Sequence, residues 1–229
     1  MENITQPALA SALTKGAPKA APWSLSGSKR LFDICCAIML CSAAAPIMVV
    51  LALAVKASSP GTCLFRQNRV GRNGKEFPVL KFRTMYSHSG NSSGLLITRS
   101  GDSRVTPVGR WLRKWKLDEL PQFVNVLMGD MSLVGHRPDM LKYMQTLTGQ
   151  DRNIMYFCPG ITSPASVRFR NEEQELAKVP PEEMERFYVS NLLPQKVRMD
   201  LDYTEHATFS SDCGILLRTA FLVLGRGKG

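Results

Sequence analysis

The stretch "KRLFDICCAIMLCSAAAPIMVVLALAVK" (residues 29–56) dominates the first half of the chain, because no charged residue occurs between Ile34 and Val55. A helix of about 20 apolar residues is long enough to cross a bilayer. Pro46 lies near the middle of the run, where a proline removes a backbone hydrogen bond and kinks or breaks a helix. The run starts too late and is too long for a cleaved signal peptide.

Positive charge flanks the apolar run on both sides. The cations that precede it are Lys15, Lys19, Lys29 and Arg30, and those that follow it are Lys56, Arg66, Arg69, Arg72 and Lys75. Positive flanks prefer the cytoplasm, and a single crossing places one flank outside. A helix that is broken at Pro46 and returns satisfies both flanks. We therefore predict a re-entrant membrane helix over residues 29–57, although hydropathy alone also fits a spanning helix.

The rest of the chain divides around this run. Residues 1–28 are rich in Ala, Ser, Pro, Gly and Thr, which predicts a flexible N-terminal tail. Residues 58–229 have the length of one domain, and a hydrophobic content of 44% allows a core. None of the six cysteines forms a CxxC pair, so a reducing compartment is the simplest interpretation.

The net charge of +10 is unevenly distributed. Residues 1–150 carry 19 Lys and Arg against 8 Asp and Glu, whereas residues 151–229 carry 10 against 11. A basic region of this size is expected to meet an anionic partner, such as nucleic acid, lipid head groups or phosphorylated small molecules.

Local patterns predict several elements beyond residue 58. Asn73-Gly74 between two strand-like runs indicates a β-hairpin, and alternation places Lys81 and Arg83 on one face of its second strand. Residues 86–103 are polar and predict a mobile loop. Thr106-Pro107 is a helix start, and a second helix is expected from about Asp118-Glu119 to Gly129. The C-terminus reads as an apolar helix that lies at a membrane surface or packs in the core.

The stretch "RKWKLDELPQ" (residues 113–122) places two adjacent carboxylates after a block of cations. Neighbouring residues on a helix diverge by about 100°, so Asp118 and Glu119 can serve different partners. One carboxylate can attack an electrophile and the other can hold Mg²⁺, while arginines clamp phosphate groups. The alternative is an acidic helix cap without catalytic meaning.

Four motifs in order resemble the bacterial sugar transferases, the monotopic polyprenyl-phosphate phosphoglycosyl transferases. They read "KRLFDICCAIML…P", "FRQNRVGRNGKEFPVLKFRTM", "VTPVGRWLRKWKLDELPQFVNVLMGDMSLVGHRPDM" and "PGITSPASV". The resemblance runs from about Lys29 to the C-terminus, and the length resembles that of the minimal single-domain members. It implies an α+β, mostly helical monotopic protein with a re-entrant helix, a small β-hairpin and an amphipathic C-terminal helix.

The resemblance also implies an activity. Members transfer a sugar-1-phosphate from a UDP-sugar to undecaprenyl phosphate through a covalent aspartyl-phosphosugar, release UMP and so start surface glycan assembly. The expected location is the cytoplasmic face of the bacterial inner membrane, with Mg²⁺ as cofactor. Membrane lipids and downstream glycosyltransferases are expected partners, nucleic acid is not expected, and a homodimer is left open. Matched by motif, Asp118 is the nucleophile and Glu119 the metal ligand.

The same matching assigns substrate-binding residues. Arg113 corresponds to a phosphate-binding arginine, and Arg137 with Pro138 corresponds to a loop that shapes the nucleotide site. Lys81 and Arg83 correspond to the basic strand near that site. Two departures stand out: His136 replaces the first proline of a usual Gly-Pro-Arg-Pro loop, and "GITSPASVRFR" replaces a usual "GITGWAQVNGR", a segment that we associate with sugar choice. The alternatives are a membrane-tethered nucleic-acid-binding protein and an inactive scaffold of the same fold.

Overall fold

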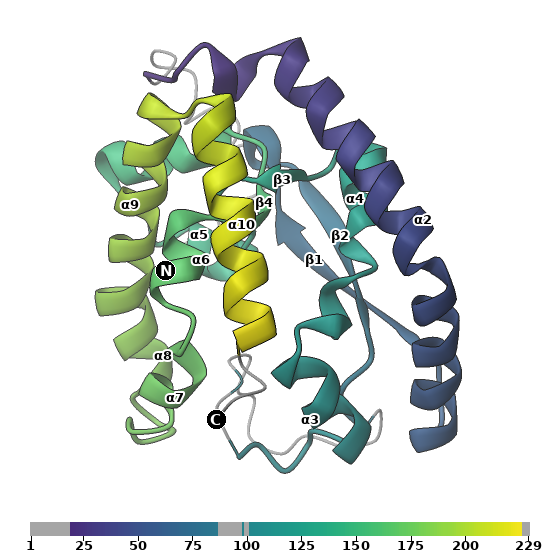
Figure 1. Cartoon of the computed structure of the whole chain (residues 1–229). Coiled ribbons are helices and arrows are strands. Elements are labelled where there is room, and N and C mark those ends of the chain that lie inside the picture. Colours follow the sequence, from purple (N-terminus) through teal and green to yellow (C-terminus); the bar gives the residue numbers. More distant parts are fainter. Residues whose placement is uncertain (1–18, 87–97, 99–100, 226–229) are drawn as a thin grey trace.

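The structure, a computed structural model, describes residues 19–86, 98 and 101–225 (Figure 1). The predicted mobile loop over residues 86–103 lies largely outside these residues. The helical elements are η1 (Trp23–Leu25), α2 (Gly27–Ser58), η2 (Arg72–Gly74), α3 (Pro107–Lys114), η3 (Leu117–Glu119), α4 (Gln122–Met128), α5 (Leu141–Met144), η4 (Gly149–Tyr156), α6 (Pro164–Arg168), α7 (Glu172–Leu176), α8 (Met184–Phe187), η5 (Tyr188–Leu192), α9 (Leu193–His206) and α10 (Phe209–Gly225). The strands are β1 (Leu64–Val70), β2 (Glu76–Phe82), β3 (Ser132–Val134) and β4 (Gly160–Thr162). The predicted α+β, mostly helical fold class is confirmed.

The segment ahead of α2 is partly structured. Residues 1–18 of the predicted tail lie outside the described residues. The backbone N–H of Ala21 donates to Thr204 O at 3.0 Å, and Trp23 Nε1 donates to Asp212 at 3.0 Å. The predicted tail boundary at residue 28 is therefore wrong for this part. The contacts that hold it come from residues more than 180 positions away, and no local pattern reveals them.

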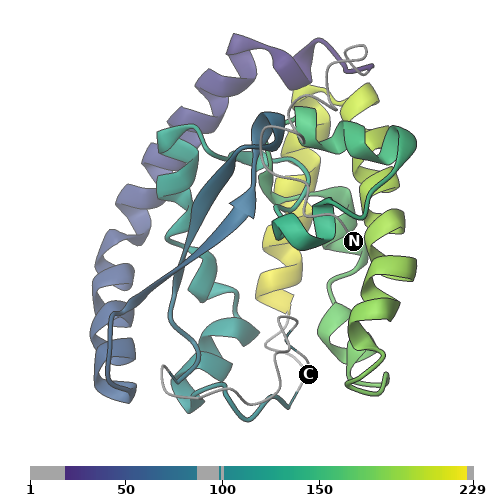
Figure 2. The same cartoon turned by 180° about the vertical axis from the view of Figure 1, so that it is seen from behind.

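Helix α2 is continuous through Pro46. Ser26 caps its start by accepting the Lys29 N–H at 3.0 Å. The break predicted at Pro46 is not present, and Figures 1 and 2 show a helix that curves along its course. A proline removes one hydrogen bond, and the remaining turns keep theirs, so the helix bends. Among the described residues, α2 is the helix whose length and composition would allow it to cross a membrane.

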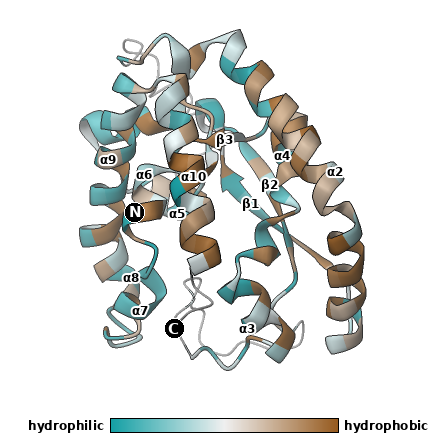
Figure 3. Cartoon of the chain, in the orientation of Figure 1, coloured by the Kyte–Doolittle hydropathy of each residue, from teal (hydrophilic) through white to brown (hydrophobic). Residues whose placement is uncertain are grey.

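One face of α2 packs on the domain along most of the helix. Ala37 joins a core cluster with α4, β2 and β3, while Leu51 and Val55 pack against Phe82 and Leu112. The opposite face exposes large apolar side chains, namely Leu31, Ile38, Ile47, Val49, Val50 and Leu53. Figure 3 shows hydrophobic colouring along α2 and on α10, in contrast to the more hydrophilic α9. Such an extended apolar surface marks a membrane or protein contact.

The predicted hairpin is confirmed. β1 pairs with β2 in antiparallel fashion, and Asn73 and Gly74 take left-handed φ values of 58° and 72° in the turn. Two hydrogen bonds of the Asn125 side chain join α4 to β2. Its amide nitrogen donates to Pro78 O and its amide oxygen accepts the Leu80 N–H, both at 2.9 Å. These bonds fix the position of the segment that leads into α4.

The helix starts around the acidic pair differ in part from expectation. Thr106 caps α3 by accepting the Gly109 N–H at 2.8 Å, and α4 ends at Gly129 with φ 94°, as predicted. However, α4 begins at Gln122 and not at Asp118. The acidic pair lies in the separate turn η3, because Lys116 adopts a left-handed φ of 56° and redirects the chain after α3.

Candidate active site

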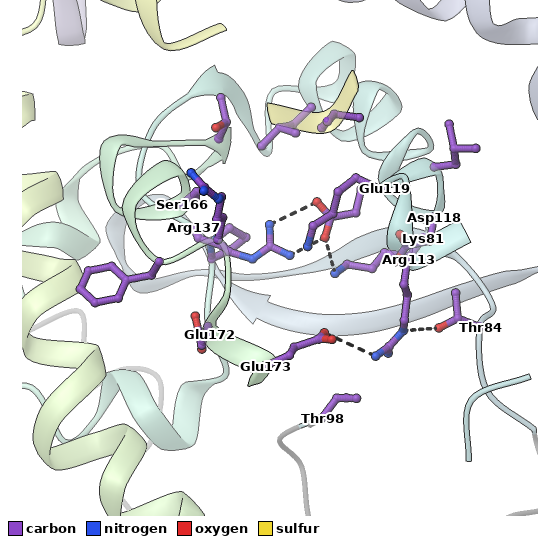
Figure 4. A pocket seen from close by; sticks show the side chains of 18 of the residues that line it. Lys81, Thr84, Thr98, Arg113, Asp118, Glu119, Arg137, Ser166, Glu172 and Glu173 are labelled. Carbon is purple, nitrogen blue, oxygen red and sulfur yellow. Dashed lines mark hydrogen bonds and ion pairs between the residues drawn. The ribbon is translucent and has the colours of Figure 1, made fainter. Parts of the chain in front are cut away.

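The two adjacent carboxylates lie on η3, and Glu119 projects toward Lys81 on β2 and Arg137 in the loop that follows β3 (Figure 4). Lys116 holds a backbone conformation that is uncommon for a residue with a side chain, and such conformations concentrate at functional sites. Leu117 and Leu120 pack against the cluster of Leu112 and Phe82, which anchors the turn. The carboxylates are thus presented by a turn with a fixed backbone.

Glu119 is held by two cations. Arg137 Nη2 lies 2.5 Å from Glu119 Oε1, and Arg137 Nη1 lies 3.2 Å from Oε2, so the guanidinium contacts both carboxylate oxygens. Lys81 Nζ lies 3.3 Å from Oε1. Burial raises the pKa of Glu119, but the charges of Arg137 and Lys81 outweigh it and hold the pKa well below its usual value. Glu119 is therefore ionised at neutral pH.

Asp118 has the opposite environment. Its side chain is buried, with the residue 6% exposed, and within the described residues its Oδ1 has no hydrogen-bond partner. Burial, followed by the charge of Glu119, raises the pKa of Asp118, while Lys81 and Lys116 partly counter the rise. An oxygen without a partner on a poorly solvated carboxylate is a suitable nucleophile toward phosphorus.

Arg113 approaches the pair from the last turn of α3. Its Nε donates to Thr84 Oγ1 at 3.0 Å, and its Nη1 lies 3.6 Å from Glu173 Oε1 on α7. Figure 4 shows Arg113 between these two groups, on the same side of β2 as Lys81. Thr84 therefore orients the guanidinium, a role that the sequence did not reveal. An arginine held in this way can clamp a phosphate with two parallel hydrogen bonds.

Arg83 lines the same cavity as the carboxylates, but its hydrogen bonds lead to another part of the chain. Its Nη2 donates to Ser59 O at 2.6 Å and to Val55 O at 3.4 Å, so it binds carbonyl groups at the C-terminal end of α2. The predicted common face for Lys81 and Arg83 does not bring their charged groups to one partner, because Lys81 reaches Glu119 whereas Arg83 reaches the carbonyls of Val55 and Ser59. Arg83 connects the C-terminal end of α2 to the hairpin.

The loop after β3 carries Arg137 and Pro138, and both line the same cavity. Asp139 fixes this loop: its Oδ1 accepts from Arg69 Nη1 at 2.7 Å, and its Oδ2 accepts from Tyr188 Oη. Sequence reasoning missed Asp139 and Tyr188, which lie 49 positions apart and share no local motif. Together they hold the loop that presents Arg137 to Glu119.

His136 occupies the position where the family pattern has proline. Its ring is buried, with the residue 5% exposed, and neither ring nitrogen has a partner among the described residues. Burial lowers the pKa of His136 to about 4, so the ring is neutral at physiological pH. The substitution therefore adds no positive charge beside Arg137.

A cavity of about 1980 Å³ joins these groups. Asp118, Glu119, Lys81, Arg113 and Arg137 line one part of it, and Figure 4 shows Glu119 directed toward Arg137 and Lys81. The segment that departs from the family pattern also contributes lining residues, namely Ser166, Val167, Phe169 and Arg170. This placement agrees with a role for that segment in substrate choice.

The metal-ligating side chains that line the cavity are dispersed. Within the described part of the chain, no group of three or more His, Cys, Asp and Glu side chains is close enough to form a complete protein site. Mg²⁺ commonly binds one or two carboxylates and completes its shell with substrate phosphates and water. The unpartnered Oδ1 of Asp118 and the ionised carboxylate of Glu119 fit that donor set.

Cations that converge on a buried carboxylate pair, beside a long apolar helix, are typical of a membrane-associated protein that handles phosphorylated molecules. The chain belongs to the bacterial sugar transferase family, whose model matches residues 24–226. This finding confirms the resemblance that the motifs indicate.

Named relatives agree with the family. The chain is 37% identical over 194 residues to a UDP-glucose:undecaprenyl-phosphate glucose-1-phosphate transferase of Caulobacter vibrioides, covering 83% of this chain and 67% of that protein. It is 38% identical to a protein of the same name from Escherichia coli, and the match covers 86% of this chain and 41% of that protein. An undecaprenyl-phosphate galactose phosphotransferase of Salmonella typhimurium is 34% identical, and the match covers 86% of this chain and 40% of that protein. The chain thus spans about two-fifths of the last two proteins.

Proposed function

We propose that this protein transfers a sugar-1-phosphate from a UDP-sugar to undecaprenyl phosphate, releases UMP and forms the first lipid-linked intermediate of a surface glycan. The observation that carries the proposal is the contrast within one carboxylate pair. Glu119 is bound by Arg137 and Lys81, whereas Asp118 Oδ1 is unpartnered in the same cavity. The printed activities of the relatives support the same reaction class.

In the first half-reaction, an Asp118 oxygen attacks the phosphorus that carries the sugar. A bond forms between that oxygen and phosphorus, the bond from phosphorus to the bridging oxygen breaks, and UMP leaves with the electron pair. The donor diphosphate is expected to bind Arg113 and Lys81, whose charges stabilise the transferring group. Because Thr84 orients Arg113, little reorganisation is needed when the donor binds.

In the second half-reaction, a phosphate oxygen of undecaprenyl phosphate attacks the same phosphorus. The bond to Asp118 breaks, the carboxylate is restored, and the sugar diphosphate remains on the lipid. Release of a carboxylate from an acyl phosphate is favourable, so a covalent intermediate divides one difficult transfer into two easier steps. Glu119 remains ionised and keeps Arg137 in place during both steps.

Mg²⁺ is the proposed cofactor, with Glu119 as its protein ligand and Asp118 near it. When bound with the substrate phosphates, it would reduce their negative charge and favour attack by a carboxylate. The contacts between Glu119 and Arg137 fix the carboxylate before any metal binds, which keeps the Glu119 oxygens in one orientation.

The proposed location is the cytoplasmic face of the inner membrane, with both ends of α2 on that side. The packing of α2 supports this topology, because Ala37 contacts the domain near one end and Val55 near the other. A helix that crossed the bilayer would carry the charged hairpin and α3 into the hydrocarbon with it. The curved α2 can instead place its exposed apolar face in one leaflet.

Transfer of label from a panel of UDP-sugars to undecaprenyl phosphate tests the proposed function. We expect label in the lipid fraction and an equal amount of UMP for at least one sugar. Salt-sensitive oligonucleotide binding without turnover of any UDP-sugar would instead support the nucleic-acid-binding alternative. Absence of both activities in the correctly folded protein would support an inactive scaffold.

A further inference from the structure

Helices α2 and α10 meet near their N-terminal ends and run apart from there (Figures 1 and 2). The junction is held by an ion pair between Lys29 Nζ and Asp212 Oδ2 at 2.6 Å and by Phe32 against Phe209, whose ring centroids are 5.1 Å apart. Trp23 adds a hydrogen bond to Asp212 at 3.0 Å. The angle between the two helices is therefore fixed at one end by buried and aromatic contacts.

The cavity that holds the carboxylate pair extends between the two helices. On α10 its lining includes Leu216, Thr219, Ala220 and Val223, which recur at i, i+3, i+4 and i+7, and it extends on either side to Leu217, Leu222 and Leu224. On α2 it is lined by Cys36, Met39 and Leu40, which also share one face. The name apolar groove is used for the side chains of Cys36, Met39, Leu40, Leu216, Thr219, Ala220 and Val223.

The apolar groove lacks the polar groups that recognise a nucleotide or sugar. Its one hydroxyl, on Thr219, is paired with Thr162 Oγ1 at 2.7 Å. Met39 is 62% exposed, so its side chain lies open toward the groove and the solvent. The opposite end of the same cavity is charged, with Lys81 and Arg113 beside Asp118. A cavity that is cationic at one end and apolar at the other fits a phosphate joined to a hydrocarbon chain.

We propose that the apolar groove binds the isoprene units next to the phosphate of the acceptor and directs that phosphate to Asp118. This inference rests on the proposed function and adds a tail subsite on identified helices. The outward faces of the same helices, which carry Ile38 and Phe221, do not line the cavity and are left for bilayer contact. One face of each helix thus serves the acceptor and another serves the membrane.

The groove offers a matched pair of double variants. Met39→Ser with Val223→Ser makes the groove polar, while Ile38→Ser with Phe221→Ser removes apolar groups from the same helices outside it. Met39 and Ile38 are similarly exposed, at 62% and 53%. Each pair is assayed in detergent micelles with geranyl, farnesyl and undecaprenyl phosphate as acceptors. UMP release from donor alone is measured in parallel.

For the wild-type protein and the outward pair, we expect KM for the acceptor to fall as the tail lengthens. The groove pair should show about a hundredfold higher KM for undecaprenyl phosphate and little change for geranyl phosphate, because two apolar side chains are removed and burial of each against the tail contributes roughly tenfold. Ala220→Phe, which fills the groove with a larger apolar group, should have the same effect. UMP release from donor alone should be unchanged in all variants.

The same chain-length dependence in both pairs would overturn the groove assignment, since the tail would then lie elsewhere. An equal loss in the outward pair, with equal loss of binding to phospholipid vesicles, would show that these residues act only through the bilayer. If the wild-type protein released no UMP from any donor, the proposed function would fail first. The two failures are therefore distinguishable.

Discussion

Arg137 binds both carboxylate oxygens of Glu119: its Nη2 lies 2.5 Å from Oε1 and its Nη1 lies 3.2 Å from Oε2. This ion pair joins the loop after β3 to the turn that carries the acidic pair. The neighbour Asp118 has no such partner among the described residues for its Oδ1. The Glu119 carboxylate is thereby held in one orientation by cations, and the Asp118 carboxylate keeps an oxygen available for attack.

Arg137→Ala should lower both stability and activity. Glu119 would keep only Lys81 as a cationic contact at a poorly solvated site, and removal of one partner from a buried ion pair is costly. Because Arg137 is itself partly exposed, we expect a loss of about 2 kcal/mol, or roughly 5 °C in the melting midpoint. Arg137→Lys, which keeps the charge, should recover part of the stability. Unchanged melting of the alanine variant would contradict the structural role.

Glu119→Gln should reduce activity and weaken its dependence on Mg²⁺. The amide cannot supply a negative ligand, and it loses the charge that holds Arg137 and Lys81. We expect at least about a tenfold higher Mg²⁺ concentration at half-maximal rate, a magnitude typical of altered metal sites. The measurement is a metal titration of UMP release at saturating donor. An identical titration curve would remove Glu119 from the proposed metal site.

Arg83→Ala should destabilise the protein without weakening the donor complex. Arg83 donates to Ser59 O at 2.6 Å, and loss of this buried hydrogen bond to a charged group costs about 2 kcal/mol. KM for the UDP-sugar, measured on the folded fraction, should stay within about twofold of the wild-type value, because the guanidinium lies at the end of α2. A large rise in KM for the UDP-sugar, with an unchanged melting midpoint, would show that Arg83 binds the donor.

Asp200→Asn should change how stability depends on pH. Burial raises the pKa of Asp200 to about 6, so the folded state binds this proton more tightly than the unfolded state. The wild-type protein therefore loses stability as pH rises from about 4 to about 6, by on the order of 3 kcal/mol. The asparagine variant lacks this loss, and its melting midpoint relative to wild type should rise across that interval.

Asp200→Ala is the control for this effect. The Asp200 carboxylate accepts the Ala165 N–H at 3.0 Å, an acceptor that asparagine keeps and alanine lacks. The alanine variant should therefore be less stable than the asparagine variant at every pH. If both variants followed the wild-type pH curve, the titration would belong to another group.

Local patterns predicted the elements whose causes are local. The turn at Asn73-Gly74, the cap at Thr106 and the helix end at Gly129 each depend on neighbouring residues. The side chain of Arg83 could not be placed in this way, since it bonds to carbonyls 24 and 28 positions earlier. The continuity of α2 through Pro46 was missed because packing on the domain stabilises both halves of the helix.

The sequence predicted which residues form the candidate site but not how each of them contributes. The cations and the acidic pair could be identified by motif, but their division of roles could not. Nothing local to Glu119 shows that it is the carboxylate bound by Arg137, 18 positions later. Likewise, Thr84 and Asp139 became visible only when the fold brought them to Arg113 and Arg69.

A covalent adduct on Asp118 is the most direct test of the proposed mechanism. The purified protein is mixed with its UDP-sugar and Mg²⁺ without acceptor, and UMP and the intact mass of the chain are measured together. We predict one UMP and one added phosphosugar per chain, located on Asp118 by peptide mapping and discharged when undecaprenyl phosphate is added. Asp118→Asn should give neither. UMP formed only in the presence of acceptor, with no adduct at any time, would contradict the mechanism.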